Sequence, residues 1–215
     1  PTWVSLDAGD EILDGAGLIV APDFLAQAVN GIGAADLSVP GATGALQTQV
    51  SNFAADGGTG GVSVSNTGAL TITTLADDSG TDVVGITAQG DVSITTTGDL
   101  TFQAPISGPG QTVTLNSTTG GLIDQTGDPI DVTAGTLIAH GEAGIALDTA
   151  IDDLTASTAG AAPMFIHEQD ALTLTNLSSA TGLLTVLAGG TITVNTLTTG
   201  GNVTLIAANG AVDDD

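Results

Sequence analysis

The chain has 215 residues and carries 24 aspartates and glutamates but no lysine or arginine, so its formal net charge is −24. Proteins that bind nucleic acids or anionic membranes use clustered Lys and Arg, so this composition excludes both kinds of partner. The absence of cysteine excludes disulfides and cysteine-ligated metal sites. A hydrophobic fraction of 41% can supply a large core, and an aromatic content of 2% requires that core to be mainly aliphatic.

The first segment that needs interpretation is Pro22 to Val29, which has two candidate structures. A proline in the first turn suits a short helix. The same apolar run, however, matches residues 133–139 in an internal repeat, and those residues have the pattern of a strand. We therefore favour a strand for this segment.

Further along the chain, short runs alternate apolar residues with Thr or Ser. This period of two is typical of half-buried strands, and clusters of Gly, Asp and Asn between the runs indicate turns. A recurrence of about 8–12 residues indicates an all-β protein. The clearest runs are 62–64, 70–72, 92–94, 100–102, 113–115, 172–174, 192–194 and 203–205.

A longer repeat is superimposed on these runs. Leu46 matches Leu147 at an offset of 101 (147 − 46), and Leu70 matches Leu172 at an offset of 102 (172 − 70). Self-similarity at a fixed period is typical of repeat architectures. The sequence thus predicts one domain over 1–215, built from two related modules of about 100 residues, approximately 11–112 and 113–215.

The strand units are too numerous and too similar for a β-sandwich, which has about seven distinct strands. A parallel β-helix fits better, because each coil of such a solenoid contacts only its neighbours and like residues stack. At roughly 20 residues per coil, the chain would form about ten coils. We predict an all-β fold of this kind.

Three segments resemble repeats of the filamentous-haemagglutinin type: Gly90 to Leu100, Gly189 to Val194 and Ser65 to Ile72. Such repeats occur in very large secreted bacterial surface proteins, including two-partner-secretion exoproteins and giant adhesins. The resemblance implies a right-handed parallel β-helix, an extracellular or bacterial cell-surface location, and a structural or adhesive role. The Asn-Pro-Asn-type motifs of the family's secretion domain do not occur here, so the chain resembles the rod region.

Clusters of acidic residues at expected turns suggest a cation site. Calcium takes six to eight oxygen ligands, and neighbouring coils could bring two clusters together. The alternative is that these residues form turns and keep the rod soluble, since no EF-hand pattern occurs. No cofactor is required by the sequence, and Ca²⁺ is the one candidate. Its candidate ligands are Asp77, Asp78, Asp82, Asp148, Asp152 and Asp153.

Catalysis is not expected. Paired carboxylates can hydrolyse glycosides, but adjacent side chains in a strand point to opposite faces. Enzymes that act on acidic polysaccharides usually hold them with Arg or Lys, and the chain has neither. The only histidines, His140 and His167, are expected at turns or on the surface.

We therefore expect an extracellular structural or adhesive rod. An alternative is a filament subunit that associates end to end with its own kind, bridged by divalent cations, and a remote alternative is a polysaccharide-active enzyme. Outward rows of Ser and Thr would keep the rod soluble, and they would also suit a carbohydrate or another cell-surface ligand. No apolar run reaches the ~18 residues of a membrane-spanning helix, so we expect no membrane insertion.

Overall fold

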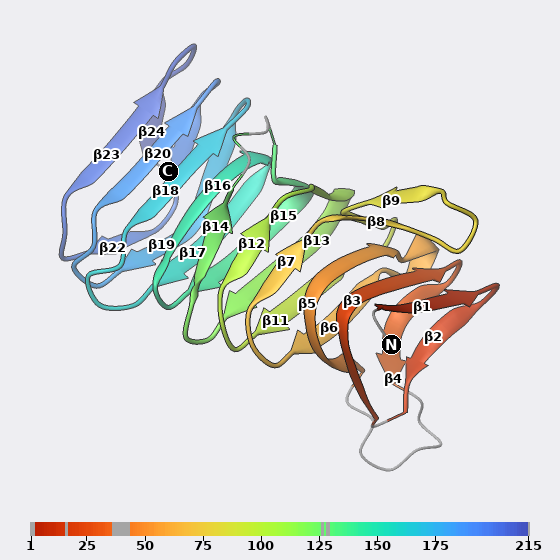
Figure 1. The fold of residues 1–215 in the computed structure, drawn as a ribbon. Helices are drawn as coiled ribbons and strands as arrows, with labels where there is room; N and C mark the ends of the chain where they lie inside the picture. The colour runs from red at the N-terminus through yellow and green to blue at the C-terminus, as the bar shows by residue number, and fades with distance from the viewer. Residues whose placement is uncertain (1–2, 16, 36–43, 126, 128–129, 215) are drawn as a thin grey trace.

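The protein is a parallel β-solenoid of about ten turns, which confirms the predicted fold class (Figure 1). The computed structural model describes residues 3–15, 17–35, 44–125, 127 and 130–214. Within those ranges, the regular structure is β apart from one 3-10 turn, η1 (Gly58–Gly60). The two ends of the described chain lie at opposite ends of the stack (Figure 1).

Twelve strands build the N-terminal half of the solenoid, and each alternating run predicted in that half lies in one of them. β3 (Leu18–Ala28) includes Pro22 to Ala28, so the strand interpretation of that segment is confirmed and the helix interpretation is wrong. The strands are β1 (Trp3–Ala8), β2 (Glu11–Asp14), β3 (Leu18–Ala28), β4 (Gly31–Ala35), β5 (Leu46–Asp56), β6 (Val62–Asn66), β7 (Leu70–Ile72), β8 (Thr74–Ala76), β9 (Asp82–Val84), β10 (Ile86–Thr87), β11 (Val92–Thr96) and β12 (Leu100–Phe102).

The C-terminal half has twelve more strands, and these contain the remaining predicted runs. They are β13 (Ile106–Ser117), β14 (Gly121–Asp124), β15 (Val132–Gly141), β16 (Gly144–Ala150), β17 (Asp153–Thr158), β18 (Met164–Glu168), β19 (Leu172–Ser179), β20 (Leu184–Ala188), β21 (Ile192–Val194), β22 (Leu197–Thr199), β23 (Val203–Ala207) and β24 (Val212–Asp214).

Strands pair in parallel with the strand one coil further on, so residues of the same kind form columns. One inward-facing column runs through Val62, Val92, Val113, Leu137 and Leu154. Side chains alternate between the two faces of a strand, so parallel pairing in this register keeps the apolar residues of such a column inside. The repeated sequence thereby becomes a continuous core.

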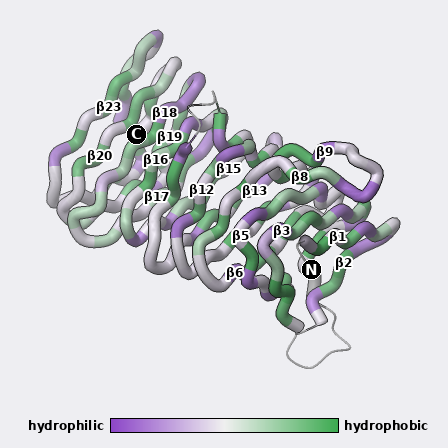
Figure 2. Tube along the Cα trace, in the orientation of Figure 1, coloured by the Kyte–Doolittle hydropathy of each residue, from purple (hydrophilic) through white to green (hydrophobic). Residues whose placement is uncertain are grey.

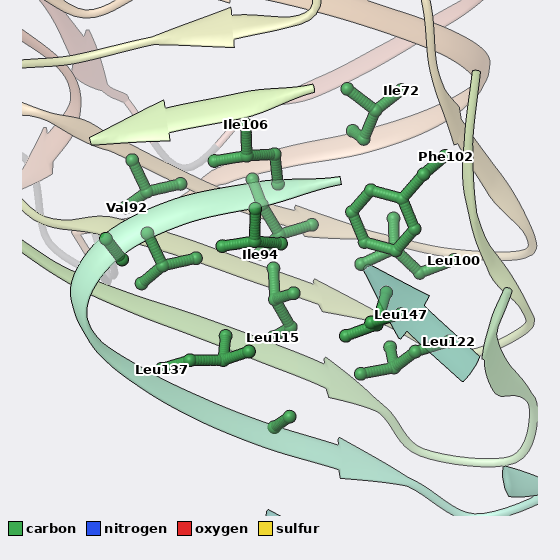
Figure 3. Packing of buried hydrophobic residues seen from close by; sticks show 14 of the residues in the cluster. Ile72, Val92, Ile94, Leu100, Phe102, Ile106, Leu115, Leu122, Leu137 and Leu147 are labelled. Carbon is green, nitrogen blue, oxygen red and sulfur yellow. The ribbon is translucent and has the colours of Figure 1, made fainter. Parts of the chain in front are cut away.

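That core is mostly aliphatic, as the composition requires. Isoleucine and leucine side chains from successive coils meet in the interior (Figure 3). Near the N-terminal end, the rings of Phe24 and Phe53 stack with centroids 5.3 Å apart. Hydrophobic and hydrophilic stretches are interspersed along the coils (Figure 2).

One element departs from the solenoid pattern. β8 and β9 pair antiparallel as a hairpin that contacts the outer side of β3 and β5. Leu25 and Ala54 are register neighbours on that outer side, where alternation predicts exposure, yet they are 1% and 0% exposed. The hairpin therefore adds a small second apolar cluster outside the solenoid.

Candidate functional site

The outer surface carries a ladder of polar residues that runs from coil to coil. Its members occupy register-matched positions on successive strands, and most of them are half-buried by their neighbours. They are Ser65, Thr95, Asn116, His140, Ser157, Ser178 and Thr198. The expected hydroxyl-rich row is thus present on one face of the rod.

A second polar ladder faces inward at one corner, where strands end. Three of its hydroxyls donate to carbonyl groups of turns. Thr96 reaches the Gly98 oxygen of its own following turn at 2.7 Å, and Ser117 reaches the same oxygen from the next coil at 2.7 Å. Thr158 reaches the Ala162 oxygen of its following turn at 3.1 Å. Gly141 takes one place in the ladder, since a Cβ there would lie 2.2 Å from the Gly144 carbonyl oxygen. These groups satisfy backbone acceptors that the turn would otherwise bury unpaired.

In the N-terminal half, a buried side-chain amide bridges two coils. The Oδ1 atom of Asn66 accepts hydrogen bonds from the Thr48 hydroxyl and the Val50 N–H, both at 2.9 Å. Its Nδ2 atom donates to the carbonyl oxygens of Val50 and Ala69, both at 3.2 Å. One neutral side chain therefore satisfies donors and acceptors on both coils.

In the C-terminal half, a buried carboxyl makes the same kind of bridge. The Oε2 atom of Glu168 accepts from the Thr149 hydroxyl at 2.7 Å and from the Ile151 N–H at 3.1 Å. Its Oε1 atom accepts from the Asp170 N–H at 3.2 Å. Burial raises the pKa of Glu168 from 4.5 to about 7, against the effect of these hydrogen bonds.

The first group of calcium candidates lies on the hairpin. Asp77 and Asp78 are in its turn, and Asp82 begins β9. The Asp77 carboxylate accepts from the Ser79 hydroxyl at 2.7 Å and from the Ser79 and Thr81 N–H groups at 2.8 Å. These bonds, chiefly that of the Ser79 hydroxyl, hold the pKa of Asp77 below its usual value. Asp77 therefore organises its own turn.

The second group lies in the C-terminal half, away from the hairpin, so the two clusters are not brought together. Asp148 is on β16, Asp152 is in the bend that follows, and Asp153 begins β17. An oxygen of Asp148 lies 3.0 Å from the Nδ1 atom of His167. In the described part of the chain, no group of three or more acidic or histidine side chains could hold a metal ion. Calcium binding stays a prediction.

Both histidines lie on the surface, as expected, but in strands instead of turns. His140 contacts the Ser157 hydroxyl at 2.8 Å and a Glu142 oxygen at 3.5 Å. The side chain of His167 is 58% exposed beside Asp148. Each ring thus has an acidic neighbour on the rod exterior.

The hairpin also walls an apolar crevice of about 210 Å³ at the N-terminal end. Its lining comes from β1, β3 and β8, and it includes the only tryptophan of the chain. The residues are Trp3, Val4, Asp23, Leu25, Leu75 and Ala76. This juxtaposition was not predicted, because only the strand register places these segments together.

Comparison of the chain with family models, curated proteins and solved structures finds no match. The resemblance to filamentous-haemagglutinin-type repeats therefore stays a prediction. Among the described residues, no helix is long and apolar enough to cross a membrane.

Proposed function

We propose that this chain is a rigid structural and adhesive module of a large extracellular bacterial surface protein. The single observation that carries the proposal is the parallel pairing of coil with coil that runs from β1 to β24 and leaves the β8–β9 hairpin outside. Each coil of a solenoid is held by hydrogen bonds to its neighbouring coils alone, so the fold grows in one dimension as coils are added. Such a rod can hold the parts of a protein at its two ends at a fixed distance from each other.

The charge and the outer polar ladder support the same role. With 24 acidic residues and no fixed cation, the rod repels copies of itself along its sides and stays dispersed in a saline medium. The hydroxyl-rich row from Ser65 to Thr198 offers hydrogen-bonding groups at the spacing of the coils, which suits a carbohydrate or another cell-surface ligand.

The test is to label intact source cells with an antibody raised against the chain. We expect labelling without permeabilisation, and beads coated with the chain should adhere to carbohydrate-bearing surfaces. A cytoplasmic protein, labelled only after permeabilisation, serves as the control. Labelling that requires permeabilisation would overturn the extracellular role, and coated beads that adhere no better than uncoated ones would remove the adhesive part.

A further inference from the structure

A feature outside the polar ladders is the pairing of Trp3 with Asp23. The two residues are register partners on β1 and β3, so their side chains leave the same face of the sheet about 4.8 Å apart along the stack. Trp3 is 40% exposed, which leaves part of its ring open to a ligand. The indole of Trp3 and the carboxylate of Asp23 are therefore neighbours on one face of the sheet.

The carboxylate of Asp23 is held in place by the next coil. Asn52, its register partner on β5, donates from Nδ2 to Oδ1 of Asp23 at 2.7 Å. An ionised carboxylate has about four acceptor sites, so this bond leaves capacity for a ligand. No lysine or arginine exists anywhere in the chain to neutralise the charge.

The remaining walls of the crevice are apolar. They are Val4 and Leu25 of the solenoid strands and Leu75 and Ala76 of the hairpin. A volume of about 210 Å³ is below the roughly 300–1,000 Å³ of sites for drug-sized ligands, so the crevice suits a small molecule or one head group.

These properties together define one ligand chemistry. Tryptophan is the best side-chain partner for a cation–π contact, and a neighbouring carboxylate adds a direct charge interaction. The net charge of −24 also raises the local concentration of cations. We propose that the crevice between Trp3 and the β8–β9 hairpin binds a small organic ammonium cation, with its alkyl groups against Leu25 and Leu75 and its charge facing Trp3 and Asp23.

The site goes beyond the proposed structural role and does not depend on it. Trp3 is the only tryptophan and the chain has no tyrosine, so its fluorescence reports on this crevice alone. Choline is a suitable probe, and 3,3-dimethylbutan-1-ol is its uncharged isostere. At constant ionic strength, we expect a saturable change in emission with choline, half-complete at a concentration about tenfold or more below that for the isostere.

Asp23→Asn should weaken choline binding about tenfold, because it removes the charge and keeps an acceptor for Asn52. Asp7→Asn is the matched control, since Asp7 is on the same strand β1 and does not line the crevice. This variant should bind choline within about twofold of the parent chain. Unchanged thermal unfolding of both variants would show that they remain folded.

A second readout uses the ligand. Saturation transfer from protein to the choline methyl protons should be lost in Trp3→Leu, which keeps an apolar side chain and removes the ring. Equal affinity for the isostere, equal loss in the two aspartate variants, or no response to choline would overturn the proposal. A response to methyl glucoside without a response to choline would assign the crevice to a neutral sugar instead and would also overturn it.

Discussion

Asn66 and Glu168 are two of the buried polar side chains that join neighbouring coils from inside the rod. Each side chain accepts hydrogen bonds from a threonine hydroxyl and from a backbone N–H of the preceding coil. Each is also the last residue of its strand. The two bridges differ in the remaining polar atom of the side chain. Nδ2 of Asn66 donates to backbone carbonyl oxygens, whereas Oε1 of Glu168 accepts a third hydrogen bond. The first bridge is neutral at every pH, and the second carries a buried titratable group.

The two bridges share one geometry but differ in charge, so equivalent positions of a repeat can respond differently to pH. Thr48 and Thr149 occupy matched positions of the 101-residue offset, and Asn66 and Glu168 match at 102. Since both polar pairs are also register partners, the same contact is built twice. The module boundaries near 112 stay a prediction, but these equivalent bridges are what two related modules would contain.

The largest expected effect comes from removing the neutral bridge. Asn66→Ala leaves buried donors and acceptors on two coils unpaired, and we expect the free energy of unfolding to fall by about 3–4 kcal/mol. Urea unfolding measures the change. Asn116→Ala on the outer ladder is the control, with a change of about 0.5 kcal/mol or less. Similar small losses in both variants would contradict the structural role of the amide.

The acidic bridge should make stability depend on pH. Because the pKa of Glu168 is about 7 in the fold against 4.5 as the ordinary value, the folded state binds the proton more tightly. Its stabilising contribution is then complete below about pH 4.5 and is lost as the pH rises through 7, by about 3 kcal/mol in total.

Unfolding at pH 5 and pH 8 tests this sign. Glu168→Gln should remove the contribution, so the difference between the parent chain and the variant changes with pH. Glu142→Gln, at an exposed position beside His140, should leave the pH dependence of the parent chain intact. The same pH dependence in the Glu168 variant would show that the other carboxyl groups account for it.

Asn66→Asp replaces the amide of the first bridge with a titratable carboxyl group, as in the second bridge. The new carboxylate would face the carbonyl oxygens of Val50 and Ala69, which now accept from the amide. We expect a loss of about 2 kcal/mol at pH 8 and partial recovery at pH 5, where the acid can donate a proton. Denaturant unfolding at pH 5 and pH 8 measures the change in the free energy of unfolding. An equal loss at both pH values would contradict the equivalence of the two bridges.

The smallest effect is expected from Thr149→Val. Losing the hydroxyl removes one hydrogen bond to Glu168, which costs about 1 kcal/mol at pH 8. The pKa of Glu168 should rise further, because that hydrogen bond lowers it. The pH midpoint of stability should therefore move upward, whereas Thr48→Val should cost a similar amount at every pH. A downward shift would show that Thr149 acts in another way.

Much of the fold could be predicted because the pattern that specifies each strand lies within a short segment of the sequence. Alternation in runs such as Val92 to Ile94 marks the inner and outer faces, and the repeat aligns equivalent positions. The hairpin could not be predicted, because its own short runs look like those of another coil. Burial of Glu168 was missed because glutamates are rarely buried, although its match to Asn66 in the repeat was a usable signal.

The solenoid can be derived from the amino-acid sequence, because period-two alternation, similar repeated units and an aliphatic composition are together consistent with a stacked parallel core. The sequence also determines that every fixed charge is negative. Which residues meet across coils, such as Trp3 with Asp23 and Thr149 with Glu168, is known from the folded structure alone. Those contacts depend on where each coil lengthens or carries a hairpin, because such insertions set the register between residues from 17 (153 − 136) to 31 (86 − 55) positions apart.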